Sequence, residues 1–164
     1  VNIDANGATI DNCEFTFNAT GDDFLTMIDV DAFDNFTASN NKFVAENNVA
    51  GAAEAIRIDE SEYIEIINNL FLGEWSDGCI VGEGTLSVLG YIADNRMYNQ
   101  DTTGGETIDL NVASTGIIKN NLMGTLFTTA PETAFDPGSM LCNQNFMVNA
   151  INETGTIVPQ TQST

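Results

Sequence analysis

The sequence predicts an all-β fold, a single-stranded right-handed parallel β-helix of about five to six coils. A short turn-and-strand pattern recurs along the whole chain, and the strands between the turns alternate apolar and polar residues. No segment shows a sustained apolar period of about 3.6 residues, which argues against a solenoid built from helices.

The recurring pattern is a pair of polar residues, usually Asn, followed by a residue of any kind and then a large apolar residue. Its six copies end at Phe15, Phe43, Phe71, Met97, Met123 and Phe146. The steps between these positions are 28, 28, 26, 26 and 23 residues, a length that suits one coil of short strands and turns. The final apolar residues are therefore expected to stack as a column inside the fold.

A second strand repeats in phase with this pattern. Its Ile28, Ile56 and Ile108 each stand 12 residues before the Asn that opens the next turn. Polar residues such as Asp29 and Arg57 alternate with the apolar ones. Because side chains alternate across a strand, one face is expected to point into the core and the other toward solvent.

Asparagine has a mechanical reason to recur at each turn. A tight bend needs a residue that tolerates the left-handed conformation, and the amide of that Asn can bond to the Asn of the next coil. We therefore expect an asparagine ladder that joins pairs such as Asn40-Asn41 and Asn68-Asn69. Its role is structural.

The chain length suits one domain, and residues 1–148 are predicted to form the β-helix. Residues 149–164 are predicted to be an extended polar tail. No amphipathic helix that would cap the first coil is evident. An uncapped end exposes strand edges that pair with other chains, so upstream residues or a bound partner should cover it.

These motifs resemble the right-handed parallel β-helix superfamily, which includes pectate lyases, polygalacturonases, phage tailspikes and capsid decoration proteins. The resemblance covers nearly the whole chain and implies an architecture, not a chemistry. A narrower similarity to β-helical phage proteins rests on Ile56-Arg57-Ile58-Asp59, Gly104-Gly105 and the stretch 129–138. It implies a structural role in a virion.

The net charge of −20 limits the classes of partner. Nucleic acids and anionic lipid surfaces would be repelled, so neither is an expected partner. No run of about 18 apolar residues is present, so no membrane-spanning helix is predicted.

No complete catalytic set is found, and an enzyme is not the preferred hypothesis. The segment Gly21-Asp22-Asp23-Phe24 is similar to the paired aspartates of polygalacturonases. That family also needs a histidine segment, and the chain contains no His. Asp is equally typical of a turn, where it bonds to its own backbone.

Alignment of the coils places Asp31, Asp59 and Glu83 in one row on the outer side of the strand that contains Ile28. Like charges at strand spacing repel each other. The row therefore predicts either a calcium ion, with these residues as ligands, or a hydrated acidic face that Arg57 partly neutralises. No organic cofactor is expected.

The outward positions of the third strand predict an apolar stripe that a partner covers. It comprises Leu70, Leu72, Tyr98, Leu122 and Met147. Such a stripe is costly on an isolated monomer. It could be covered by another copy of the rod, as in a trimer, by the loop 124–138 or by the tail 148–164.

Trp75 is the remaining candidate for a contact with a protein or a sugar. It stands between Glu74 and Asp77 in a short loop, and the alternative is a loop anchor folded onto the rod. Tyr63, Tyr91 and Tyr98 are expected on different faces.

Together these features favour a structural virion component, such as a capsid decoration (cement) protein or a tail-appendage module. It would act through contacts with itself, as a homo-oligomer, and with other virion proteins. The expected location is the virion surface or the extracellular space. The alternative hypothesis is a carbohydrate-active β-helix, either a polysaccharide lyase or glycosidase or a sugar-binding module.

Overall fold

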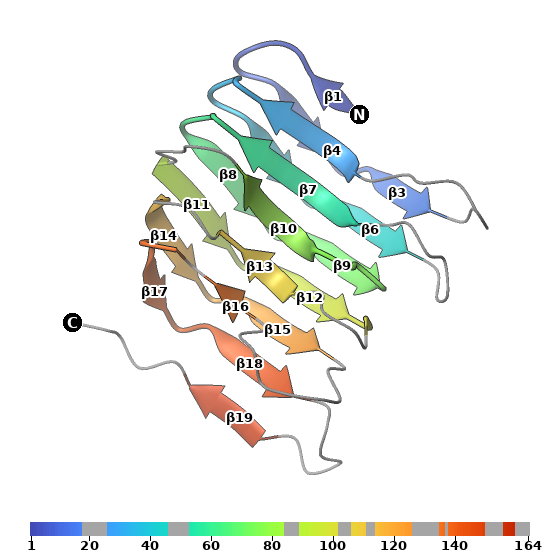
Figure 1. Cartoon of the computed structure of the whole chain (residues 1–164), viewed down its shortest axis with the longest axis vertical. Helices are drawn as coiled ribbons and strands as arrows, with labels where there is room; N and C mark the ends of the chain where they lie inside the picture. Colours follow the sequence, from blue (N-terminus) through green and yellow to red (C-terminus); the bar gives the residue numbers. More distant parts are fainter. Residues whose placement is uncertain are drawn as a thin grey trace.

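The computed structural model describes residues 1–17, 26–45, 53–83, 89–101, 106–110, 114–125, 135–136, 138–149 and 156–159. Within these ranges every element is a strand, and the strands form an all-β parallel solenoid of three sheets. Figure 1 shows them stacked from β1 at the top to β19 at the bottom. No helix in the described ranges is long and apolar enough to span a membrane.

Each turn of the solenoid contributes one strand to each sheet. Sheet A contains β1 (Asn2–Ile3), β4 (Thr26–Asp31), β7 (Glu54–Asp59), β10 (Gly78–Glu83), β13 (Glu106–Asp109) and β16 (Phe135–Asp136). Sheet B contains β2 (Thr9–Asp11), β5 (Thr37–Ser39), β8 (Ile64–Ile67), β11 (Leu89–Ala93), β14 (Thr115–Lys119) and β17 (Leu141–Asn143). Sheet C contains β3 (Glu14–Phe17), β6 (Lys42–Ala45), β9 (Leu70–Gly73), β12 (Arg96–Asn99), β15 (Leu122–Thr125), β18 (Phe146–Asn149) and β19 (Thr156–Pro159).

Four complete turns, from β4–β6 to β13–β15, form the middle of the rod. A shorter turn lies at each end, where β1 and β16 have only two residues each. The predicted number of coils therefore counts these two short turns as well. The pairings between successive turns are parallel, and only β19 runs antiparallel, against β18.

The core is built from the inward columns of the three sheets. In sheet A, Ile28, Ile56, Ile80 and Ile108 are in register and are all 0% exposed. Full burial of one such side chain stabilises the fold by about 1.5–3 kcal/mol. The inward columns therefore supply most of the hydrophobic stabilisation.

The aromatic column of sheet C agrees with the sequence prediction as far as Met123. The Phe43 ring lies 5.0 Å from Phe15 and 4.8 Å from Phe71, with interplanar angles of 7° and 8°. Met97 and then Met123 continue this column in register and are buried. The rings stack because parallel strands in register place equivalent residues one above another.

The prediction for the last coil is wrong by one residue. Met147, and not Phe146, is in register with the inward Met123. Phe146 instead pairs with the outward Leu122 and is 48% exposed. A shift of one residue exchanges the two faces of a strand. The structure takes Asn145 as the ladder residue of this turn, which places Phe146 outside.

The asparagine ladder runs along the turns between sheets B and C. Its members, all buried, are Asn41, Asn69, Asn95, Asn121 and Asn145. The Nδ2 atom of each donates to the Oδ1 atom of the next at 3.0–3.1 Å. The same Oδ1 atom accepts the backbone N–H of the preceding member at 2.8–3.0 Å. The second Nδ2 hydrogen bonds to a carbonyl of the preceding turn, as from Asn95 to Ile66 at 2.8 Å.

The first residue of each pair has a φ of 53–59°: Asn12, Asn40, Asn68, Asp94, Asn120 and Gln144. As predicted, a residue in this conformation can also bond to the next coil, since Asn68 Nδ2 donates to Asn40 Oδ1 at 2.7 Å and Asn120 Nδ2 donates to Asp94 Oδ1 at 3.2 Å. The second residue of each pair forms the buried ladder, which the prediction did not separate from this exposed one. At the N-terminal end Cys13 occupies the ladder position, where its backbone N–H donates to Asn41 Oδ1 at 2.9 Å.

Candidate interaction surfaces

The outer side of sheet C, here called the sheet C face, carries two columns of residues in register. One column is Glu14, Lys42, Leu70, Arg96, Leu122 and Phe146. The other is Thr16, Val44, Leu72, Tyr98 and Gly124. Apolar side chains thus lie next to each other both along the columns and across them.

Apolar and charged residues share this face: Arg96 lies in register between Leu70 and Leu122, whereas Val44, Leu72 and Tyr98 form a continuous apolar run in the other column. Tyr98 is 40% exposed, and Leu70 and Leu122 are half-buried against adjacent strands. Lys42 Nζ lies 2.7 Å from Glu14 Oε1 at the N-terminal end of the face. A cluster of apolar side chains beside paired charges is typical of a protein contact surface.

Four of the predicted partner-facing residues lie together on the sheet C face, namely Leu70, Leu72, Tyr98 and Leu122. Met147 does not take the predicted position, because its register is that of the inward column. Phe146 replaces it. The signal that could have found this is Asn145, since the ladder Asn is always followed directly by the outward residue.

Trp75 is not on the surface. It is 0% exposed, and its backbone N–H donates to Asn99 Oδ1 at 3.1 Å. Asn99 Nδ2 donates in turn to the carbonyls of Trp75 at 2.8 Å and Glu106 at 2.9 Å. In the described part of the chain Trp75 Nε1 is buried without a hydrogen-bond partner. Trp75 is therefore the loop anchor, and the contact interpretation is wrong.

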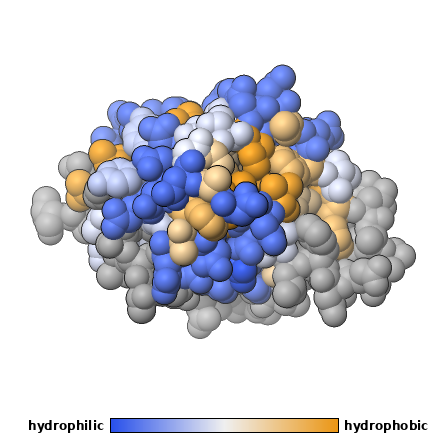
Figure 2. Space-filling view, turned by 90° about the horizontal axis from the view of Figure 1, so that it is seen from above, coloured by the Kyte–Doolittle hydropathy of each residue, from blue (hydrophilic) through white to orange (hydrophobic). Residues whose placement is uncertain are grey.

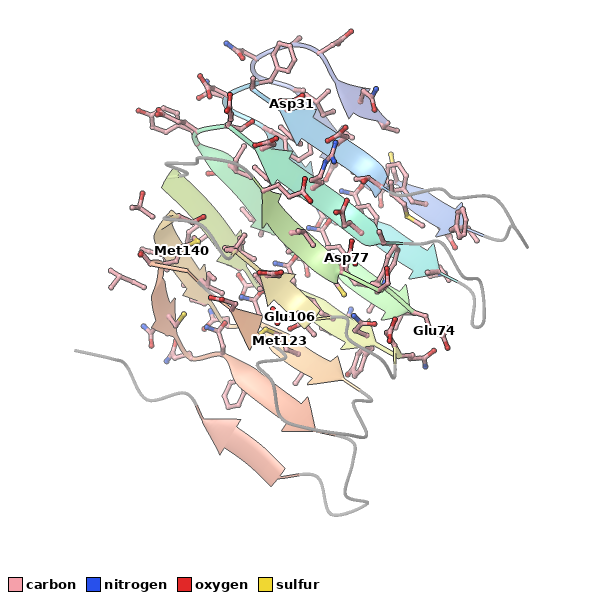
Figure 3. The ribbon with its side chains drawn as sticks, viewed as in Figure 1. Asp31, Glu74, Asp77, Glu106, Met123 and Met140 are labelled. Carbon is pink, nitrogen blue, oxygen red and sulfur yellow. The ribbon has the colours of Figure 1, made fainter. Side chains whose placement is uncertain are left out.

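The outer side of sheet A, here called the sheet A face, is acidic. Asp31, Asp59 and Glu83 are in register across β4, β7 and β10, as the alignment of the coils indicates. Among the described residues, no three His, Cys, Asp or Glu side chains form a group able to hold a metal ion. Figure 3 shows Asp31 at the opposite end of the strands from Asp77.

Arg57 provides the positive charge of this face. Its Nε and Nη2 atoms donate to the two Asp29 carboxylate oxygens at 2.9 and 2.8 Å, and Nη1 lies 3.4 Å from Glu83 Oε2. The hydrogen bonds that Arg57 donates to Asp29 raise the pKa of Arg57 further above its ordinary value. Arg57 therefore holds two neighbouring carboxylates of the sheet A face by direct ion pairs.

A buried carboxyl lies at the start of β7. Glu54 is 4% exposed, and its Oε2 atom accepts a hydrogen bond from the Thr26 hydroxyl. Burial raises the pKa of Glu54, and the charge of Glu83 raises it further, whereas the Thr26 hydrogen bond lowers it. The burial of Glu54 was not predictable, because Glu is normally exposed. The predicted aspartate pair Asp22-Asp23 lies outside the described residues.

The outer side of sheet B contains a cleft that the sequence analysis missed. It has a volume of about 240 Å³ and is lined by Asn35, Thr37, Tyr63, Ile64, Glu65 and Tyr91. Tyr63 and Tyr91 therefore line one cleft, and the expectation that they lie on different faces is wrong. Tyr63 precedes β8 and Tyr91 lies in β11, so the turn between sheets A and B brings them together.

The N-terminal end of the rod is a further apolar area. Ile10 and Phe15 of the first turn are partly buried and pack against the core. Figure 2, which looks onto this end, shows apolar residues gathered between hydrophilic ones.

Comparison of the chain with family models, with curated proteins and with solved structures finds no match in any of the three.

Proposed function

We propose that the chain is a structural virion component, a capsid decoration protein or tail-appendage module, that assembles through the sheet C face. The observation that carries this proposal is the group of large apolar side chains on that face: Leu70, Leu72, Tyr98, Leu122 and Phe146. Burying them against another protein removes apolar surface from water, which stabilises a complex.

A second copy of the chain is the partner that this face fits. Two of the four cationic residues, Lys42 and Arg96, lie in its columns. Its one acidic residue within the two columns, Glu14, is paired with Lys42. Two copies that each carry a net charge of −20 repel least where both surfaces are closest to neutral.

The virion setting rests on the resemblance of the repeats to β-helical phage proteins. The fold suits that role, because a stack of hydrogen-bonded coils presents flat sheets along a rod.

Light scattering coupled to size-exclusion chromatography tests the interface. The wild type should elute with the mass of an oligomer, and Leu72→Asp should elute as a monomer because it places a charge between the apolar residues Val44 and Tyr98. Ile117→Asp is the matched control, since Ile117 is a 41% exposed apolar residue on sheet B. A wild type that stays monomeric at its highest soluble concentration would contradict the interface.

Purified particles of the encoding virus test the setting separately. Mass spectrometry should detect the chain in many copies per particle. Absence from the particles would overturn the virion role even if the chain forms an oligomer.

A further inference from the structure

We propose that the cleft on sheet B is a binding site for a neutral carbohydrate. Its volume of about 240 Å³ suits a single sugar ring of a longer glycan. The proposal does not depend on the sheet C face, because the lining residues belong to sheet B and to the turns that lead into it.

The register of sheet B brings the lining residues together. Thr37 of β5 is in register with Glu65 of β8, and Glu65 is in register with Tyr91 of β11. Tyr63 adds its side chain from the turn before β8, and Asn35 adds its side chain from the turn before β5. Two aromatic rings, a carboxylate, an amide and a hydroxyl thus line one cleft.

The backbone of Tyr63 shows that the ring is kept there at a cost. Tyr63 has a φ of 60°, as does Asn35, which stands 28 residues earlier at the equivalent position of the preceding coil. Asn tolerates the left-handed region, whereas a bulky aromatic residue is strained in it. Burial does not offset the strain, because Tyr63 is 51% exposed. The equal φ at Asn35 shows that the repeated turn imposes this conformation, and the Tyr at this position places an exposed aromatic ring at the cleft.

The second ring, that of Tyr91, is in contact with a lysine of the next strand. Lys119 Nζ lies 5.0 Å from the centroid of the Tyr91 ring, a cation–π contact. Tyr91 is half-buried between its neighbours in register, Glu65 and Ile117. The cleft therefore has one fixed aromatic wall and one aromatic residue at its rim.

The polar groups of the cleft select the class of ligand. The Glu65 carboxylate accepts hydrogen bonds, and the Asn35 amide and the Thr37 hydroxyl both donate and accept them. An apolar ligand would remove these groups from water without new partners. An anion would meet a carboxylate and no cationic lining residue on a chain of charge −20. A neutral sugar offers hydroxyls to the polar groups and a C–H face to the rings.

Isothermal titration calorimetry with soluble probes tests the site. The probes are maltohexaose, cellohexaose, laminarihexaose and mannohexaose as neutral glycans, with oligogalacturonate as the anion and choline as the cation. At least one neutral glycan should bind, and the Tyr63→Asn variant should lower its affinity about tenfold, since loss of a stacked aromatic contact removes roughly this much.

Tyr63→Asn should also raise the melting temperature, because Asn suits the left-handed conformation. Misfolding cannot explain a variant that has a higher melting temperature and a lower affinity for the glycan than the wild type. Tyr98→Asn is the matched control on sheet C, and its affinity for the glycan should equal that of the wild type. Equal losses in the two variants would contradict the site.

Glu65→Gln separates a sugar site from a cation site. The amide oxygen of Gln still accepts a hydrogen bond from a hydroxyl, so glycan binding should fall only a few-fold. If choline binds and its binding is lost in Glu65→Gln, while no neutral glycan binds, the cleft is a cation site and the proposal is wrong. The absence of binding by every neutral glycan would overturn it as well.

Discussion

The sheet A face and the sheet C face share one backbone plan and differ in almost every outward residue. On sheet A the outward columns carry Asp31, Asp59 and Glu83, with Arg57 beside them. On sheet C the equivalent columns carry leucines and a tyrosine, with the charged residues Glu14, Lys42 and Arg96 among them. The inward columns of both sheets are apolar. In a solenoid the core fixes the inward residues, so the outward columns are where function can differ.

The two faces also differ in how their side chains interact with solvent. On sheet A, Asp31 and Glu83 are exposed to solvent, and Arg57 forms ion pairs with Asp29 and Glu83. Nothing in water compensates the exposed apolar area of sheet C, so that face gains most from a partner.

Disruption of the asparagine ladder, which supports both faces, should have the largest effect on the free energy of unfolding. Asn95→Ala removes the acceptor of the Asn69 backbone N–H and Nδ2, and the donor to the Ile66 carbonyl. We expect a loss of about 3 kcal/mol or more in the free energy of unfolding, because buried groups are left unpaired. Urea denaturation measures it. Asn68→Gly, which removes only an exposed ladder bond and suits the left-handed conformation, should cost far less.

Sheet A also contains a buried carboxyl, that of Glu54. The pKa of Glu54 is raised in the folded state, so the folded state binds the proton more tightly than the unfolded state does. Stability should therefore fall as the pH rises from about 4.5 through the folded pKa. Glu54→Gln stays neutral and should be more stable than the wild type at pH 7, with no gain at pH 4.

Thermal denaturation at the two pH values measures this difference. Glu62→Gln, at an exposed turn, is the control and should leave the unfolding free energy unchanged at both. A gain in Glu54→Gln that is the same at pH 4 and pH 7 would contradict the role of its charge.

The smallest expected effect compares the ion pairs of the two faces. Arg57→Gln should cost about 1 kcal/mol, since the bidentate pair with Asp29 is partly shielded from water. The matched change on sheet C, Lys42→Gln, should cost less, because that pair is well exposed. Denaturation in low and in molar salt measures both. Screening should shrink the Arg57 effect, and an effect that persists unchanged in molar salt would show that packing causes it.

Repetition made the fold and the acidic row predictable. The spacing from Ile to the turn Asn is 12 residues in three coils and 14, ending at Asp94, in the coil of Ile80. The register of Asp31, Asp59 and Glu83 nevertheless follows from alignment of the isoleucines, because each stands three residues after the Ile of its strand. The last coil was ambiguous because Asn143 and Asn145 both fit the pattern. Only the burial of Asn145 in the ladder decides between them.

Features that occur once were not predictable. Trp75 is the single tryptophan, and no repeated position indicates whether its loop folds inward. The cleft of Tyr63 and Tyr91 depends on the turn between sheets A and B, where the positive φ of Tyr63 sets the direction of its side chain. No sequence pattern marks a tyrosine in that conformation.

The asparagine ladder also gives the rod an electrical direction. Every ladder carbonyl oxygen points toward the preceding turn, since it accepts from the earlier member and never from the later one. The side-chain dipoles therefore align along the stack and polarise one another. Cys13, which has no amide, ends this series at the negative end. The ladder thus has its carbonyl end at the first described coil and its amide N–H end at the last.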